Sequence, residues 1–146
     1  MRSVSLVTIL FAVSILMFAE TAVAETTFDG TWSVTTNVHD YKNPNGTMSR
    51  AYTWQFPMTV KNGVLHGERG KRGSYDFLEI NGTITADGDA TIQAEGITGK
   101  GTEFTKGHTA AGNRYTYTVT AHFKGRQGTG QSVSDARTRI FTFVKN

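Results

Sequence analysis

The sequence has 146 residues, contains no cysteine and carries a formal net charge of +3. The lack of cysteine excludes a disulfide scaffold and a cysteine-ligated metal centre, and so small a positive excess does not indicate a nucleic-acid partner. A chain of this length forms one domain with its own core, and 16 glycines among many Thr, Val and aromatic residues are typical of short strands joined by turns.

The first 24 residues have the pattern of a secretory signal peptide. Arg2 is followed by the apolar run Val4–Phe18 and by Ala22-Val23-Ala24, which is a small-x-small cleavage motif. The alternative is an uncleaved membrane anchor, but an apolar run of about 15 residues is shorter than the ~20 that span a bilayer. We therefore predict a signal peptide at 1–24 and a secreted or periplasmic domain at 25–146, without membrane association after cleavage.

Two strands are predicted at the start of this domain. The first places Trp32, Val34, Thr36 and Val38 on one face, and the second places Tyr52, Trp54, Phe56, Met58 and Val60 on one face. Pro57 lies on the polar face of the second strand. Because proline cannot donate a ladder hydrogen bond, we expect an edge or a bulge there.

Two hairpins follow. Asn62-Gly63 favours a two-residue type I′ turn, which would pair Lys61 with Val64 and point His66 and Glu68 outward. Ala86-Asp87-Gly88 is typical of a three-residue hairpin loop with a left-handed glycine. That loop would place Ile84 opposite Ala90.

The rest of the chain contains two clear strands. We expect a long loop or a short irregular strand over 97–113, and then a strand at Arg114–Lys124 with Tyr115, Tyr117 and Phe123 inside. The segment 125–135 is rich in glycine and is expected to be polar, with at most a short strand at 128–132. A final strand is predicted at Arg137–Lys145.

These elements predict an all-β fold. About seven to eight antiparallel strands joined by local hairpins form a meander, which avoids open edges by closing into an up-and-down barrel. The alternative is a two-sheet sandwich, which needs longer Greek-key connections.

Side chains with catalytic or metal-binding chemistry form no recognisable motif. The four histidines, His39, His66, His108 and His122, lack metal-ligand spacing and are interpreted as solvated, as are Arg69, Lys71 and Arg72 in a turn. No serine lies in a nucleophile motif, and the carboxylates are scattered. We therefore predict neither a metal nor a cofactor, and the sequence supports no enzymatic activity.

The aromatic residues suggest a binding site inside the barrel. Four residues on two predicted strands are expected to point inward: Trp54, Tyr52, Tyr115 and Tyr117. The hydroxyls of the three tyrosines could orient a small apolar or aromatic ligand. Small inward residues are expected to leave space beside these rings: Gly82, Ala90, Ala94, Gly96 and Ala121. The alternative is that the rings only fill the core.

Gly30-Thr31-Trp32 resembles the Gly-x-Trp signature of the calycin barrels, which include the lipocalins and avidins. The resemblance implies that Trp32 closes the barrel base and that Arg137 or Arg139 of the last strand packs over it by cation–π contact. The chain is also similar to small exported bacterial proteins in its runs 28–32, 62–67 and 87–90.

Three functions are compatible with this pattern, and the third, an enzyme, has the least support because it would need a cleft that holds a group with a shifted pKa in catalytic geometry. The first is a binding module that holds a small, partly apolar ligand inside the barrel. The second is a protein-interaction module, such as an inhibitor of a secreted or periplasmic hydrolase, that presents the segments 108–113 or 125–135 to a partner.

Overall fold

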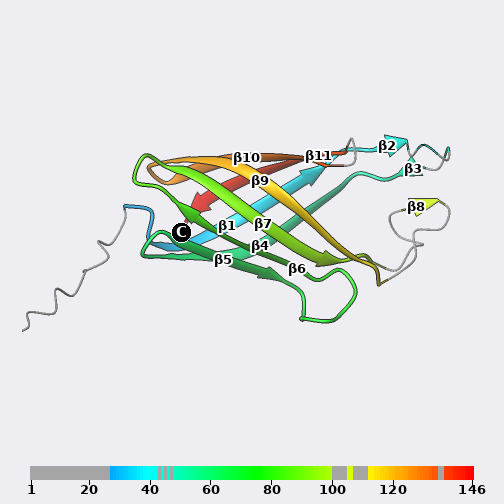
Figure 1. The fold of residues 1–146 in the computed structure, drawn as a ribbon, viewed down its shortest axis with the longest axis horizontal. Coiled ribbons are helices and arrows are strands. Elements are labelled where there is room, and N and C mark those ends of the chain that lie inside the picture. The colour runs from blue at the N-terminus through cyan, green and yellow to red at the C-terminus, as the bar shows by residue number, and fades with distance from the viewer. Residues whose placement is uncertain are drawn as a thin grey trace, which may run out of the picture.

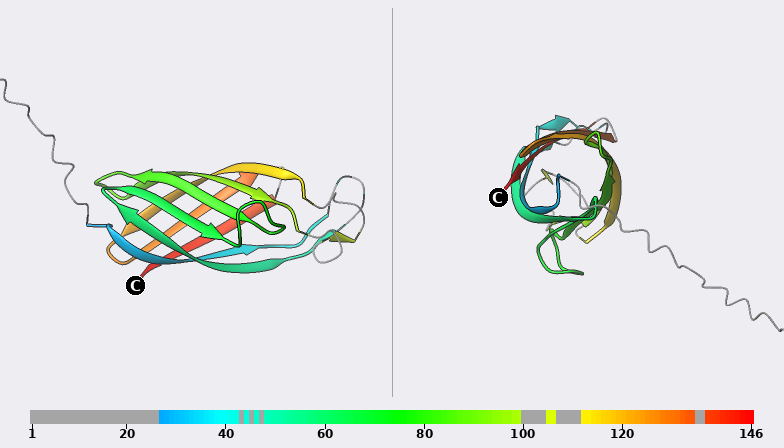
Figure 2. Two further views of the ribbon diagram at one scale, coloured as in Figure 1. Left: turned by 90° about the horizontal axis from the view of Figure 1, so that it is seen from below. Right: turned by 90° about the vertical axis from the view of Figure 1, so that its left-hand side faces the viewer.

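The computed structural model describes residues 27–42, 44, 46, 48–99, 105–106, 112–134 and 137–146, so the predicted signal peptide lies outside the described residues. Eight strands close into one antiparallel barrel, and three short strands form a separate small sheet (Figures 1 and 2). The barrel strands are β1 (Gly30–Val38), β4 (Tyr52–Lys61), β5 (Val64–Arg69), β6 (Leu78–Ile84), β7 (Asp89–Ile97), β9 (Arg114–Lys124), β10 (Gln127–Ser134) and β11 (Arg137–Lys145).

The barrel is an up-and-down meander, as predicted, and not a two-sheet sandwich. Each barrel strand pairs with the next barrel strand along the chain, and β11 returns to pair with β1. This closure leaves no strand of the barrel without a neighbour on either side. The described residues contain no helix long and apolar enough to span a membrane.

The predicted hairpins are confirmed. Asn62 and Gly63 have φ angles of 52° and 73°, as a type I′ turn requires, and Lys61 pairs with Val64. The Asp29 carboxylate accepts hydrogen bonds from both turn amides, at 2.7 Å from Asn62 N and 3.1 Å from Gly63 N. In the second hairpin Gly88 has a φ of 93° and Ile84 pairs with Ala90.

The segment 125–135 differs from the prediction. It is mostly a regular strand, β10, which pairs with β9 and β11. Its glycines hide the strand pattern because they have no side chain that would mark the inner face. A Cβ at Gly128 would lie 2.7 Å from the ring of Phe123, so the glycine makes room for that ring.

One half of the barrel is closed and filled. Four aromatic side chains that are at most 1% exposed pack against one another here: Trp32, Phe123, Phe141 and Phe143. Trp32 meets Phe123 edge to face with ring centroids 5.2 Å apart, Phe123 is tilted against Phe143, and Phe143 stacks on Phe141. Phe28 is buried against Phe123 at this end of the barrel, and its carbonyl accepts a hydrogen bond of 2.9 Å from Trp32 Nε1. Trp32 therefore lies at the closed end of the barrel.

The other half of the barrel is split along two seams. β4 and β5 pair only from Met58 to Lys61, and β9 and β10 pair only from Thr120 to Lys124. Beyond these points the ribbon β4–β1–β11–β10 separates from the ribbon β5–β6–β7–β9, as their divergence in Figure 1 shows. Pro57 is the first β4 residue past the β4–β5 pairing, which confirms the expected edge at this proline.

A small sheet lies beyond the split end. It contains β2 (Tyr41–Lys42), β3 (Met48–Ser49) and β8 (Thr105–Lys106), in the order β2–β3–β8 (Figures 1 and 2). β2 follows β1 and β3 precedes β4, so this sheet extends the β1–β4 hairpin. β8 is the short irregular strand that 97–113 was expected to contain.

Candidate functional site

The inner face of the barrel changes character between its two ends. The closed half is apolar, whereas the split half carries polar and charged residues at inward positions. We call this set the open-end cluster; it contains Thr36, Tyr52, Trp54, Arg69, Tyr115, Tyr117, Ser132, Arg137 and Arg139. All four aromatic residues that the sequence singled out belong to it.

Cation–π contacts connect the strands across the β4/β5 seam. The Arg69 guanidinium of β5 lies 4.0 Å from the Trp54 ring centroid of β4, where backbone pairing between these strands has ended. The Trp54 ring lies 4.4 Å from that of Tyr52, and Arg137 of β11 lies 5.3 Å from the Tyr52 ring. Arg69, Trp54, Tyr52 and Arg137 therefore form one continuous row of contacts.

A second row spans the β9/β10 seam. The Arg139 guanidinium of β11 lies 4.4 Å from the Tyr117 ring of β9, and Tyr117 stacks parallel to Tyr115 with centroids 6.0 Å apart. A cation–π contact stabilises by about 0.5–2 kcal/mol, depending on its exposure. The two seams are therefore held by side chains where backbone hydrogen bonds are missing.

Two hydroxyls of the cluster have no hydrogen bond with the described residues, and one of them is buried. The Tyr117 side chain is 7% exposed, and its hydroxyl forms no hydrogen bond with any described residue. Thr36 is 1% exposed, and its Oγ1 is buried without a hydrogen-bond partner among the described residues. Burial also raises the pKa values of Tyr115 and Tyr117 above the ordinary range, so both stay protonated and can donate.

The three arginines do not lie where the sequence placed them. The β11 residue that pairs with Trp32 is Lys145, and Arg137 and Arg139 lie at the opposite end of the same strand. Neither arginine can therefore pack over Trp32, because six or more residues separate them from its partner. Arg69 is not a solvated turn residue either, since it ends β5 at an inward position and is half-buried.

The small inward residues do not leave open space beside the rings. A Cβ at Gly96 would collide with the ring of Tyr115, and a Cβ at Gly82 would collide with the backbone of Thr91. Ala90, Ala94 and Ala121 are at most 5% exposed. These residues allow rings and strands to pack closely, so they leave no space for a ligand beside the rings.

Two hollows flank the split end. One of about 480 Å³ is lined by Val38, His39, Tyr52 and Ile140, among others, where β1 ends and β4 and β11 begin. Another of about 210 Å³ is lined by Gly96, Ile97, Arg114 and Tyr115, among others, where β7 ends and β9 begins. Each hollow thus contains one tyrosine of the open-end cluster.

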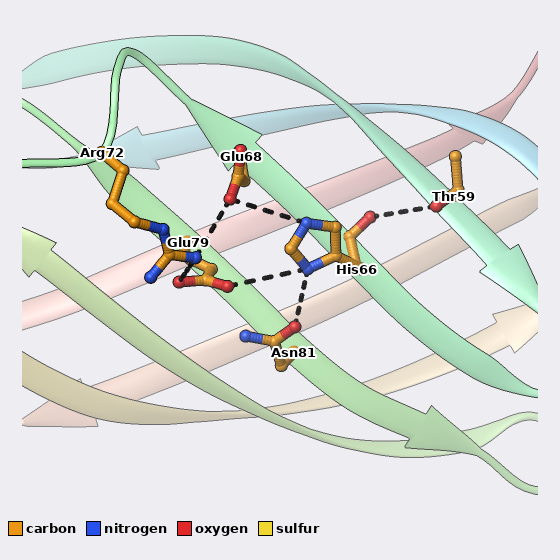
Figure 3. Close-up of polar contacts among 6 residues, drawn as sticks. All are labelled: Thr59, His66, Glu68, Arg72, Glu79 and Asn81. Atoms are coloured by element: carbon orange, nitrogen blue, oxygen red, sulfur yellow. Dashed lines mark hydrogen bonds and ion pairs between the residues drawn. The ribbon is translucent and has the colours of Figure 1, made fainter.

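A separate polar cluster lies on the outer face of β5 and β6 (Figure 3). Arg72 donates to Glu79 at 2.7 Å and to Glu68 at 3.2 Å, and His66 Nδ1 lies 2.7 Å from Asn81 Oδ1. A hydrogen bond from Asn81, and another from Arg72, hold the pKa of Glu79 below its ordinary value although burial opposes this. The cluster fixes the 70–77 connection onto the sheet.

The same cluster is the one group of potential metal ligands in the described part of the chain. The ligand atoms of His66, Glu68 and Glu79 lie within 4.8 Å of one another. The Arg72 guanidinium already supplies both carboxylates with positive charge and hydrogen bonds, so a metal ion would have to displace it. This geometry favours a structural clamp.

The two segments expected to present a partner-binding loop are described only in part. The segment 108–111 lies outside the described residues, and 125–135 is largely strand β10.

Comparison of the chain with protein-family models, with curated proteins and with solved structures gave no match.

Proposed function

We propose that this protein is an exported barrel that binds a small, partly apolar ligand at its split end, between the two ribbons. The observation that carries the proposal is that polar atoms of the open-end cluster lack hydrogen bonds with the described residues: Thr36 Oγ1 and Arg137 Nε, which are buried, and the hydroxyl of the largely buried Tyr117. An unpaired buried hydroxyl costs about 1–3 kcal/mol. A ligand atom that accepts its proton would remove this cost.

The surrounding side chains support the same proposal. Tyr52 and Trp54 of β4 and Tyr115 of β9 supply flat aromatic faces at the split end. Tyr52 and Tyr115 also line hollows of about 480 and 210 Å³, which they share with outward-facing residues such as Thr53 and Glu95. Flat apolar walls with a few convergent polar groups are typical of small-molecule sites. The likeness to the calycin barrels suggested by Gly30-Thr31-Trp32 belongs to this proposal, as does export through the predicted signal peptide.

The experiment is native mass spectrometry of the protein purified from its own source. We expect a small molecule to be retained, and we expect Tyr117→Phe to weaken its retention without changing the melting temperature by more than a few degrees. Tyr75→Phe is the matched control, because Tyr75 is 50% exposed in the β5–β6 connection. A protein that retains nothing, with Tyr117→Phe equal to or more stable than the wild type, would show that the ring is only core filling.

A further inference from the structure

We infer that the open-end cluster selects an anion, namely a carboxylate attached to a flat aromatic body, with the guanidinium of either Arg69 or Arg137 as the partner of its head group. This inference rests on the proposed function, and it adds the charge and the shape of the ligand. It is argued from the charge balance of the inner face, from the free donors of the arginines, and from the rings that hold them.

The charge on the inner face is not balanced. Three arginines occupy inward positions at the split end, and none of the inward positions of the eight barrel strands carries Asp or Glu. Arg69 and Arg137 are half-buried, and neither has a carboxylate within ion-pair distance among the described residues. Half-buried positive charge is normally paired with an anion. Asp40 acts on Arg137 only from beyond ion-pair distance, and Arg69 contacts Asp76 through the backbone carbonyl of that residue.

Both arginines keep donors that the protein does not use. Arg69 donates from Nη1 to the carbonyl of Asp76 at 2.6 Å, and Arg137 donates from Nη2 to the carbonyl of Arg50 at 2.7 Å. These two backbone contacts fix the direction of each guanidinium. Arg137 Nε is buried without a hydrogen-bond partner within the described chain. A guanidinium has five N–H donors in a planar fork, which matches the two oxygens of a carboxylate.

The rings define the rest of the ligand. Arg69 and Arg137 lie against Trp54 and Tyr52, whose own rings are 4.4 Å apart. A carboxylate held by either guanidinium therefore has aromatic faces beside it, against which a flat unsaturated body can stack. A saturated chain would bury area there but would not gain the ring contacts. The cluster is thus suited to an aryl carboxylate more than to a fatty acid.

Isothermal titration calorimetry at pH 7 can test this with three probes of similar size: 2-naphthoate, its neutral analogue 2-naphthamide, and octanoate. We expect the mature wild-type protein to bind 2-naphthoate about tenfold or more tightly than either other probe, because charge-assisted hydrogen bonds are stronger than neutral ones. One of the two variants Arg69→Gln and Arg137→Gln should weaken 2-naphthoate binding about tenfold, and both should leave 2-naphthamide binding unchanged. Unchanged 2-naphthoate binding in both variants would overturn the assignment of the head group.

Arg126→Gln is the matched control, because Arg126 is exposed at the closed end and donates to the carbonyl of Lys145. It should leave binding of all probes unchanged. The wild-type comparison of naphthoate with naphthamide remains decisive even where a variant fails to fold. Equal affinity for the two would overturn the selection of an anion while the proposed function stands. Tighter binding of octanoate would overturn the aromatic body, and binding of no probe would contradict both proposals.

Discussion

The guanidinium of Arg139 lies 4.4 Å from the ring centroid of Tyr117, and this contact crosses the barrel where β9 and β10 have ceased to pair. Ser132 of β10, the residue opposite Arg139, lies beyond the last β9–β10 pair. The contact therefore joins the two ribbons of the split end. It also places a positive charge beside the largely buried ring of Tyr117, one of the residues in the proposed binding site.

Replacing this arginine should loosen the seam. We expect Arg139→Gln to lower the free energy of unfolding by about 1–2 kcal/mol, since a partly desolvated cation–π contact is lost. Amide hydrogen exchange should rise near 115–119 and stay unchanged at the closed end, near 121–124. Arg126→Gln serves as the control for loss of one exposed arginine. Unchanged exchange near 115–119 would mean that the seam does not depend on Arg139.

Trp32 is the largest side chain of the closed end. Because it is fully buried against Phe123 and donates to the Phe28 carbonyl, we expect Trp32→Ala to destabilise the protein by about 3–5 kcal/mol, measured by denaturant unfolding. The control is Trp54→Ala, which removes a half-buried ring from the split end and should cost less. A loss below about 1 kcal/mol for Trp32→Ala would contradict the packed closed end.

The Asn62-Gly63 turn should resist substitution by alanine. Both residues have positive φ, a conformation that costs an ordinary L-residue roughly 1–2 kcal/mol. The double change to Ala-Ala should therefore reduce stability by about that amount or more, and Asp29→Ala should weaken the same turn by removing its two hydrogen bonds. Asp87→Ala in the second hairpin is the control. Full stability of the Ala-Ala protein in urea unfolding would argue against the turn.

The outer cluster predicts a loss of stability in acid. The pKa of Glu79 is lower in the folded protein than its ordinary value of 4.5, chiefly through its hydrogen bond with Asn81. Its contribution is therefore complete above pH 4.5 and is lost as the pH falls through the folded pKa. Glu79→Gln should flatten the acid side of a stability–pH curve, whereas the exposed carboxylate change Asp87→Asn should not. Identical acid slopes for wild type and Glu79→Gln would contradict this role.

The hairpins and the barrel could be predicted because their signals are local. Asn62-Gly63 and Gly88 determine turn types, and alternation on each side then determines register and inner face. The place of Arg137 and Arg139 is not local. It depends on the pairing of Trp32 with Lys145, which requires the register between the first and the last strand.

The same reason explains what the sequence missed at the site. The inward arginines share the alternation of Phe141 and Phe143, and this signal could have identified them as inner residues. The seams could not have been predicted, because they result from the points where β4 stops pairing with β5 and β9 with β10. Strand β10 was hidden by Gly128 and Gly130, whose inner positions are taken up by Phe123 and Ala121.

The central claim, that a ligand occupies the split end, can be tested most directly by nuclear magnetic resonance. Amide spectra would be recorded on protein purified from its own source, before and after it is unfolded and refolded to release bound molecules. The account predicts shifts concentrated at 52–56, 115–118 and 137–140, with the closed end unchanged. Identical spectra, or shifts concentrated around Trp32 and Phe123, would contradict it.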